Sequence, residues 1–467
     1  MDLNEAVLYE SSYVTGTRLT PLRPEERSPA SVSGSPYIER EVVVDPSREY
    51  QRILGFGGAL TEASGYVLSL LPDKERERVI RMYFDRREGH GYTFARTHMN
   101  SCDFSFGNWA LVEKEDPSLS SFDLGPSRRY QLPLVKDAWR VSGGLRLLVS
   151  PWSPPAWMKD NREMCHGGKL LPEYYPVWAR YFVSFIRALQ GEGLEVWGVT
   201  VQNEPEAVQT WESCIYTGEE EGRFVRDHLV PTFRGAGLEG KKVLIWDHNR
   251  DRLPERVEES FGLEGVREVV DGVAYHWYSG PQYDNVEETS SRIDGKLLVF
   301  TEGCIEGGAR PGEWWVGERY GYEMIQDLLH GAKAWIDWNV VLDTEGGPNH
   351  AGNFCDAPVL VDIEGKEVFP QSSYYYIGHL SRWCRPGSRR IEVTVPEAGD
   401  EDSSAGGRFW EQRDLALGVR DPEGRIVLVL YNSRDVSIMY SVRRKGDRGE
   451  FRHVCPPHSI QTVILEA

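Results

Sequence analysis

Two glutamates follow directly on apolar stretches of this chain, and together they supply the acid pair that hydrolysis of a glycosidic bond requires. Glu204 ends the stretch Val199-Thr-Val-Gln-Asn-Glu204, and Glu302 ends Leu297-Leu-Val-Phe-Thr-Glu302. An apolar, β-branched run that stops at a carboxylate is typical of a barrel strand that ends at an active-site rim. Glycosidic bond cleavage uses one carboxyl group to protonate the leaving oxygen and another to attack or to activate water. The pair therefore indicates a glycoside hydrolase.

The spacing and the neighbours of the two glutamates support this interpretation. They are 98 residues apart (302 minus 204). A (β/α)8 barrel spends roughly 31 residues on each unit if ~250 residues form the whole, so about three units separate them. A single glutamate after a strand is more often a helix cap or a surface charge. Here Asn203 and Pro205 flank the first glutamate and Gly303 follows the second, which restricts the backbone at both positions.

The elements that must position this pair alternate along the middle of the chain. Eight apolar runs read as strands, at Ile53–Phe56, Tyr92–Thr97, Leu145–Ser150, Val196–Val201, Val243–Asp247, Val273–Trp277, Leu297–Thr301 and Ala334–Val340. Amphipathic stretches such as Tyr174–Leu189 and Tyr320–Leu329 lie between them and read as helices. Alternating strands and helices predict an α/β fold, a (β/α)8 TIM barrel.

The two ends of the chain show a different pattern. Short alternating strands occur near the N-terminus, notably at Ile38–Val44, and after residue 390, where Asp421-Pro-Glu-Gly424 reads as a hairpin turn. We therefore predict a side β-sandwich domain built from both chain termini. The predicted domains are strands of the sandwich in 1–50, the catalytic barrel in 51–385 and the rest of the sandwich in 386–467.

Polar and aromatic residues follow other predicted strands, where a barrel places its active site. Sugars pack C–H faces on aromatic rings and need partners for their hydroxyls, so Trp together with Asp, Asn and His is expected there. We predict substrate contacts by Asp103, Trp152, His276, Tyr278 and Trp338. Asp103 also fits a cap of the following loop. Arg96 is expected to pair with a carboxylate and keep the nucleophile ionised. Core packing and substrate contact are equally good interpretations of Trp157, Trp277 and Trp335.

Composition restricts partners and location. The formal net charge of −19 argues against nucleic acid or an anionic membrane surface as partner. The sequence has no apolar run of 18 residues, so membrane insertion is not expected. The acidic start lacks the features of a secretory signal, and the 7 cysteines are never spaced C-x-x-C, which predicts a cytoplasmic protein with reduced thiols. Cys304 is interpreted as a packing residue rather than a nucleophile, because no His lies near it in sequence.

Metal and cofactor motifs are weak in this sequence. It has no H-E-x-x-H sequence, no EF-hand loop and no Walker sequence, and Gly55-Phe-Gly-Gly58 lacks the third glycine of a dinucleotide-binding fingerprint. We predict no metal and no cofactor.

At these residues the chain resembles glycoside hydrolase family 30, and most closely its glucosylceramidase branch. The resemblance spans roughly residues 50–385, and the flanks are compatible with the side β-domain of the family. It rests on Gly55-Phe-Gly-Gly-Ala59, Ser101-Cys-Asp-Phe-Ser105, Ser150-Pro-Trp152, Asn203-Glu-Pro205, His276-Trp-Tyr278, Glu302, Asp337-Trp-Asn339, Glu345-Gly-Gly-Pro-Asn349 and Asn353-Phe354.

The resemblance implies a role for each matching residue. Glu204 would be the general acid/base and Glu302 the nucleophile of an enzyme that retains anomeric configuration and uses no metal. The glucose subsite would be lined by Asp103, Trp152, Asn203 and Trp338, with His276, Tyr278 and Asn353 close by. The resemblance also implies glucosylceramidase-like activity and sphingolipid metabolism, whereas related enzymes cleave β-1,6-glucan, β-xylosides or β-fucosides.

The sequence as a whole predicts a retaining, exo-acting β-glycosidase that hydrolyses β-glucosides through a covalent glycosyl-enzyme. We expect the carboxyls of Glu204 and Glu302 to lie about 5–5.5 Å apart. We also expect burial and the charge of Glu302 to raise the pKa of Glu204. A β-1,6-glucanase, β-xylosidase or β-fucosidase is the alternative within the family, and a non-catalytic carbohydrate-binding protein is the alternative from another class. The expected partner is a β-linked glycoside or oligosaccharide, and the sequence leaves a homo-oligomer open.

Overall fold

A computed structural model describes residues 6–23, 26, 36–395, 407–447 and 449–466. The chain divides into two compact units. One comprises 56–309 and 334–369, and the other comprises 1–55, 310–333 and 370–467. Among the described residues, no helix is both long and apolar enough to cross a membrane. Each unit is described separately below.

The first unit contains a closed barrel of eight parallel strands, in the order β10-β11-β4-β5-β6-β7-β8-β9. Their bounds are Gly55–Ala59 for β4, Phe94–Met99 for β5, Arg146–Pro151 for β6, Val196–Thr200 for β7, Lys242–Asn249 for β8, Gly272–His276 for β9, Leu297–Glu302 for β10 and Ala334–Asp337 for β11. Each predicted strand coincides with one of these to within a few residues. The predicted barrel is therefore confirmed.

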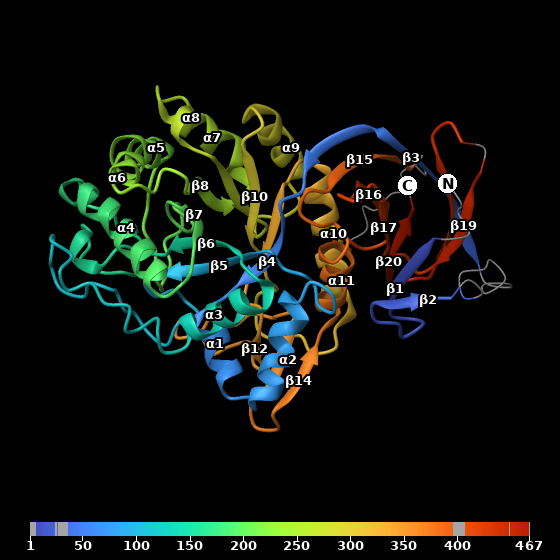
Figure 1. Ribbon diagram of the computed structural model, residues 1–467, viewed down its shortest axis with the longest axis horizontal. Helices are drawn as coiled ribbons and strands as arrows, with labels where there is room; N and C mark the ends of the chain where they lie inside the picture. The colour runs from blue at the N-terminus through green and yellow to red at the C-terminus, as the bar shows by residue number, and fades with distance from the viewer. Residues whose placement is uncertain (1–5, 24–25, 27–35, 396–406, 448, 467) are drawn as a thin grey trace. The chain divides into compact units, whose positions relative to one another are not determined.

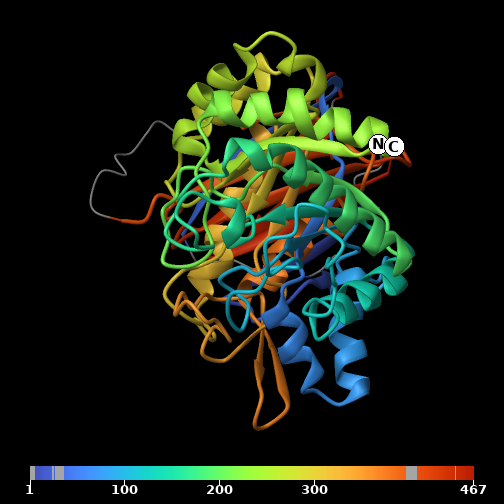
Figure 2. The same cartoon turned by 90° about the vertical axis from the view of Figure 1, so that its left-hand side faces the viewer.

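Helices follow the strands of the barrel and lie outside it (Figure 1). They are α1 (Glu62–Ser69), α2 (Asp73–Phe84), α3 (Gln131–Ser142), α4 (Tyr175–Gly191), α5 (Gly218–Phe224), α6 (Val230–Gly235), α7 (Leu253–Phe261), α8 (Val266–Val269) and α9 (Tyr283–Arg292). A small sheet of β12 (Leu342–Asp343), β13 (Val359–Asp362) and β14 (Glu367–Pro370) follows β11. Its β13–β14 hairpin projects on the same side as α1 and α2 in both views (Figure 2).

The second unit contains a sheet of nine strands, in the order β19-β18-β3-β15-β16-β17-β20-β1-β2. Their bounds are Val7–Ser12 for β1, Thr20–Leu22 for β2, Tyr37–Arg52 for β3, Arg389–Thr394 for β15, Asp414–Arg420 for β16, Ile426–Asn432 for β17, Ser437–Arg444 for β18, Phe451–Cys455 for β19 and Ser459–Leu465 for β20. Strands from both ends of the chain pair directly, because β1 is antiparallel to β20 and β3 is parallel to β18.

The core of this second unit is formed by the inward side chains of those strands, among them Leu8, Val42, Leu428, Ile438 and Val463. Helices α10 (Trp314–Leu329) and α11 (Ser372–Ser381) pack on each other and on strands of the sheet. Helix α10 precedes barrel strand β11 in sequence, as the sequence predicted for a helix at Tyr320–Leu329. It nevertheless belongs to the compact unit of the sandwich. The predicted side domain built from both termini is confirmed.

The glycines of the Gly55-Phe-Gly-Gly stretch allow close contact between barrel strands. A Cβ on Gly57 would lie 2.3 Å from the carbonyl oxygen of Phe94 on β5. We expect Gly57→Ala to lower the free energy of unfolding by about 1–3 kcal/mol, because backbone must move to admit the methyl group. Denaturant unfolding followed by fluorescence measures the change. Gly191→Ala is the matched control, since a Cβ there meets nothing within 4 Å. An unchanged midpoint for Gly57→Ala would contradict this account of the strand contact.

Candidate functional site

The two predicted glutamates meet at the carboxyl ends of barrel strands. Glu302 is the last residue of β10, and Glu204 follows β7. One carboxylate oxygen of each and a ring nitrogen of His276 all lie within 4.8 Å of one another. Both acids are largely buried, with side chains 15% exposed for Glu204 and 8% for Glu302. They border a common cavity of about 150 Å³. The barrel therefore joins two carboxyl groups that are remote in sequence.

Arg96 on β5 lies beneath the pair and is fully buried. Its Nη1 donates to Glu302 Oε2 at 2.5 Å. Its Nη2 donates to Asn203 Oδ1 and to Asp247 Oδ2, each at 2.8 Å, and its Nε donates to Ser150 Oγ at 3.0 Å. The guanidinium thus holds the nucleophile candidate through a charge-assisted hydrogen bond, as the sequence predicted for Arg96.

Asp247, which sequence reasoning did not select, is the second centre of this network. Its carboxylate accepts hydrogen bonds from Thr200 and Thr301, each at 2.6 Å, and from Arg96. It also lies 3.1 Å from Nε2 of His276. Burial opposes the charged carboxylate, but Arg96 and His276 outweigh burial and hold the pKa of Asp247 far below its usual range. Asp247 therefore stays ionised inside the barrel.

His276 ends β9 and lies between two acids. Its Nδ1 is 3.2 Å from Glu204 Oε1, and its Nε2 is 3.1 Å from Asp247 Oδ1. Burial favours the neutral ring, but the charge of Glu302 and the hydrogen bonds to Asp247 and Glu204 raise the pKa of His276 to about 9. At neutral pH His276 is therefore a positively charged imidazolium. His276 is fully buried, is not among the residues that border the cavity and holds Glu204 in place, while its contact with a sugar stays a prediction.

The electrostatics of the two glutamates differ from the expectation. Burial and the charge of Glu204 raise the pKa of Glu302, although His276 and Arg96 act in the opposite direction. Burial also raises the pKa of Glu204, but the charges of His248 and His276 outweigh it and leave that pKa below its usual value. The prediction of a raised pKa for Glu204 is therefore wrong, and of the two acids Glu302 has the higher pKa.

Two stacked tryptophans form an aromatic wall of the cavity. Trp152 follows β6 and Trp338 follows β11, and their ring centroids are 5.2 Å apart with planes inclined by 23°. Both are buried against Phe104 in an apolar cluster, and Arg96 lies 4.8 Å above the ring of Trp152. Such rings offer the flat apolar surface on which a pyranose packs. Both tryptophans border the cavity, where the sequence placed them.

Asp103 and Asn353 lie together on the cavity wall. Asn353 Nδ2 donates to Asp103 Oδ2 at 3.1 Å, while Asp103 Oδ1 is buried without a hydrogen-bond partner among the described residues. Burial and the charge of Glu302 raise the pKa of Asp103 well above its usual value. Asn349 holds the loop, because its Oδ1 accepts from the backbone of Ala351 and Asn353. Part of the Glu345–Asn349 stretch thus serves to present Asn353.

Tyr278 also borders the cavity, and its hydroxyl donates to Glu302 Oε1 at 3.1 Å. The same hydroxyl lies 3.5 Å from Sγ of Cys304. Burial raises the pKa of the Cys304 thiol well above its usual range, so the thiol stays protonated and is no nucleophile. Asn203 borders the cavity beside Glu204. Eight predicted site residues therefore surround one cavity, and Arg96 and His276 support it from below.

Several residues fall outside the predicted set or outside the cavity. Trp157, Trp277 and Trp335 are core residues that do not border it. The cavity is bordered in addition by Gln209, Trp211, His248, Asn249, Cys304, Glu306 and Cys355. His248 and Asn249 end β8, so the rule applied to the other strand ends would have found them. Gln209 and Trp211 lie in the irregular loop after Glu204, which carries no periodic signal.

The close approach of Glu204, His276 and Glu302 also has the spacing of a metal site. Both nitrogens of His276 are already engaged by carboxylates, and its pKa of about 9 keeps the ring positively charged at neutral pH. An imidazolium has no lone pair for a cation, so this arrangement suits proton chemistry better than metal binding.

A barrel whose strand ends bring two carboxyl groups to one aromatic-lined cavity defines a glycoside hydrolase. Residues 53–384 match the glycosyl hydrolase family 30 TIM-barrel domain, and residues 387–463 match the glycosyl hydrolase family 30 beta sandwich domain. The chain belongs to glycosyl hydrolase family 30, as its resemblance indicated, and it is a glycosidase.

Named relatives and a solved structure agree with this assignment. The chain is 30% identical to lysosomal acid glucosylceramidase of Mus musculus, over 91% of this chain and 83% of that protein. It is 28% identical to endo-1,6-beta-D-glucanase of Neurospora crassa, over 73% of this chain and 72% of that protein. The crystal structure of SrfJ from Salmonella typhimurium matches with a TM-score of 0.88 at 31% identity, covering 99% of both chains.

The charge of His276 leads to a prediction on pH dependence. Below pH 9 the imidazolium favours the ionised forms of Glu204 and Glu302. Removing this charge in His276→Gln raises the pKa of both acids. The whole bell-shaped profile of kcat/KM should therefore move to higher pH, by roughly one unit or more, with a lower maximum.

Hydrolysis of a nitrophenyl β-glycoside across pH measures this shift. His166→Gln is the matched control, because the side chain of His166 is 61% exposed and pairs with Glu163. A profile of His276→Gln that keeps both limbs at the wild-type pH would exclude the proposed influence of His276 on the acid pair.

Proposed function

We propose that the protein is a retaining, exo-acting β-glycosidase that hydrolyses β-glucosides through a covalent glycosyl-enzyme intermediate. The approach of Glu204 and Glu302 within 4.8 Å at their nearest oxygens carries this proposal. Retaining enzymes separate the two carboxyl groups by about 5–5.5 Å, whereas inverting enzymes leave about 6.5–9.5 Å for an intervening water. The short approach supports direct attack by one of the two acids.

Glu302 is the better candidate for the nucleophile because its orientation is fixed by two donors. Arg96 donates to one carboxylate oxygen and Tyr278 to the other. A carboxylate oxygen of Glu302 attacks the anomeric carbon while the bond to the leaving oxygen breaks, and that oxygen takes the proton of Glu204. Positive charge that develops on the sugar ring stabilises ionised Glu302, which moves the shared proton towards Glu204 as the reaction proceeds.

The second step reverses these roles. Glu204, now ionised, accepts a proton from water as the water oxygen attacks the anomeric carbon and the ester bond to Glu302 breaks. His276 donates to Glu204 and keeps it oriented through both steps. Two inversions at the anomeric carbon leave the product in the β configuration.

The size of the cavity supports exo action. Its volume of about 150 Å³ is well below the ~300–1,000 Å³ that drug-sized ligands occupy. Such a space suits one sugar ring packed on Trp338 and Trp152, with Asp103 Oδ1 free to accept from a hydroxyl. Gln209, Trp211 and His248 also border the cavity, and the leaving group must contact residues beyond the bound ring.

Substitution of the two acids separates their roles. Glu302→Gln should abolish turnover of every β-glucoside, because the nucleophile is lost. Glu204→Gln should lower kcat/KM on alkyl β-glucosides by about 10²–10⁴-fold and have far less effect on a dinitrophenyl β-glucoside, whose leaving group needs no proton. Initial rates on both substrates, with product stereochemistry by NMR, provide the measurement.

Azide extends this test. Azide should restore turnover of the dinitrophenyl substrate by Glu204→Gln and form the β-glycosyl azide, because it attacks the glycosyl-enzyme without a base. Glu219→Gln, a change of an acid whose side chain is 59% exposed, is the matched control and should keep wild-type rates. A first product in the α configuration would rule out the retaining mechanism. Binding of sugar without any turnover would favour the carbohydrate-binding alternative.

Substrate choice can be tested with a panel. Nitrophenyl β-glucoside should be the best of the β-glucoside, β-xyloside, β-fucoside and β-galactoside, and β-1,6-glucan should release glucose alone, because one ring fills the cavity. Glucosylceramide in detergent tests the lipid aglycone. Release of oligosaccharides from β-1,6-glucan, measured by chromatography, would instead indicate an endo-acting glucanase. The cytoplasmic location and the oligomeric state stay predictions for fractionation and light scattering.

A further inference from the structure

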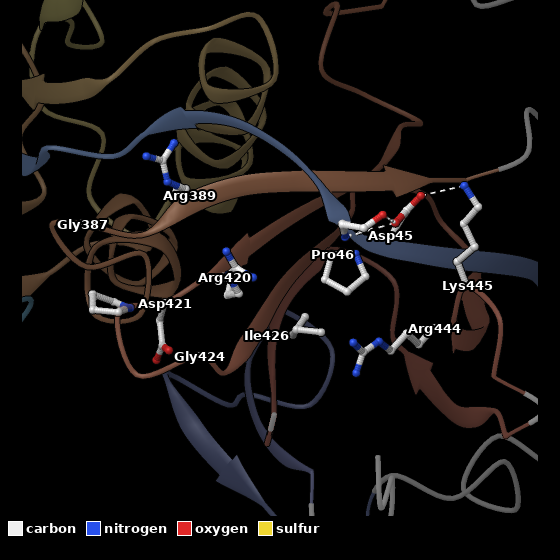
Figure 3. A pocket seen from close by; sticks show the side chains of 12 residues that line it. Asp45, Pro46, Gly387, Arg389, Arg420, Asp421, Gly424, Ile426, Arg444 and Lys445 are labelled. Carbon is white, nitrogen blue, oxygen red and sulfur yellow. Dashed lines mark hydrogen bonds and ion pairs between the residues drawn. The ribbon is translucent and has the colours of Figure 1, made fainter.

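A second, larger cavity lies in the sandwich unit and plays no part in the proposed catalysis. Its volume is about 860 Å³. It is bordered by the middle of β3, the start of β15, the β16–β17 turn and the end of β18, and Figure 3 shows its lining. None of the described residues that border it is aromatic. Stacking of a neutral sugar ring therefore has no platform here, in contrast to the barrel cavity.

Four cations border this cavity in a chain of net charge −19: Arg389, Arg420, Arg444 and Lys445. Two acids also border it, but each has a cation of its own. Asp421 pairs with Arg425 at 2.7 Å, within the hairpin turn. Asp45 pairs with Lys445 at 2.7 Å and accepts from the backbone of Ser47. These two acids therefore do not compensate the charge of the three arginines.

The three arginines have donors to spare. Arg389 and Arg420 both pair with one carboxylate, that of Glu49. A guanidinium carries five N–H donors, and one carboxylate shared by two such groups cannot occupy them all. The side chain of Arg444 has no ion pair or hydrogen bond to any described residue. The three arginines and the carboxylate of Glu49 together carry a net charge of +2.

Their placement also suits a ligand from solution. Arg420 and Arg444 lie on either side of Ile426 in the cavity (Figure 3). The side chains of Arg389 and Arg420 are 48% and 43% exposed, so they are accessible. Planar guanidinium forks match the oxygens of phosphate and sulfate, and several of them together favour a group of higher charge than a carboxylate.

From this cavity we infer that the sandwich unit binds an oxyanion, namely a phosphate or sulfate group, either as the free ion or as the ester of a small sugar. The volume exceeds the needs of one ion, and the remaining wall of proline, serine and glycine leaves room for a polar carrier. This cavity shares no lining residue with the barrel cavity, so a test of anion binding is independent of the proposed function.

Isothermal titration of the full chain at low salt tests this site. Inorganic phosphate, inorganic sulfate and glucose 6-phosphate are titrated separately. At least one should bind saturably, and added sodium chloride should weaken it through screening. Arg420→Gln and Arg444→Gln should each weaken that binding about tenfold or more, because each removes charge-assisted hydrogen bonds. Tighter binding of glucose 6-phosphate than of inorganic phosphate identifies a sugar phosphate as the ligand. Equal binding identifies the free ion as the ligand.

Arg443→Gln is the matched control. It removes the same charge one position away on β18, where the side chain pairs with Glu41 instead of bordering the cavity. Its affinity for the anion should equal that of the wild type. The inference is overturned if none of the three anions binds saturably, or if Arg443→Gln weakens binding as much as Arg444→Gln, which would mean general attraction to basic surface rather than a site.

Discussion

The charge balance around Arg96 is the constraint on which the rest of the active site depends. A fully buried guanidinium requires carboxyl groups beside it, and here Asp247 and Glu302 both pair with Arg96. His276 adds a second buried positive charge. At neutral pH His248 adds no charge, because burial lowers the pKa of its ring. The negative groups that face the two cations are Asp247 and the pair of Glu204 and Glu302. Neutrality is reached when the pair carries one negative charge between them, which means one ionised and one protonated carboxyl group.

This balance is the protonation state that acid-assisted nucleophilic attack requires. The pair can hold its single proton on either carboxyl group, so the two titration steps belong to the pair rather than to one residue. Burial and the charge of Glu204 raise the pKa of Glu302, whereas His248 and His276 lower that of Glu204, so a proton shared by the pair favours Glu302. The reactive arrangement, with the proton on Glu204, has the same total charge. Moving the proton from Glu302 to Glu204 therefore leaves the net charge of the barrel unchanged. Positive charge that develops on the sugar beside Glu302 is sufficient to favour this reactive arrangement.

Backbone geometry explains which parts of this network the sequence could predict. The eight strands and eight of the cavity residues follow from apolar runs, the polar residues at their ends and the family motifs, since parallel strands gather their carboxyl ends at one rim. Asp247 ends the predicted strand Val243–Asp247, so the strand-end rule could have selected it. The sequence does not reveal the bulge of β8, where Trp246 and Asp247 adopt φ values of 73° and 55°. A bulge breaks the two-residue alternation that would reveal an inward side chain. The left-handed backbone of Glu204, with φ of 48°, is equally invisible in sequence.

The residues of this site fall into two groups, those held within barrel strands and those in loops. Arg96, Asp247 and His276 lie within strands, where hydrogen bonds of the barrel hold them and neighbouring charges depend on one another. The loop residues Gln209 and Trp211 have no part in that balance, and they border the cavity from outside the strands. A change in such a loop alters the fit of the sugar or aglycone without disturbing the acid pair. The barrel chemistry can therefore be assigned from strand ends alone, whereas the preferred glycoside depends on loops whose conformation the strands do not determine.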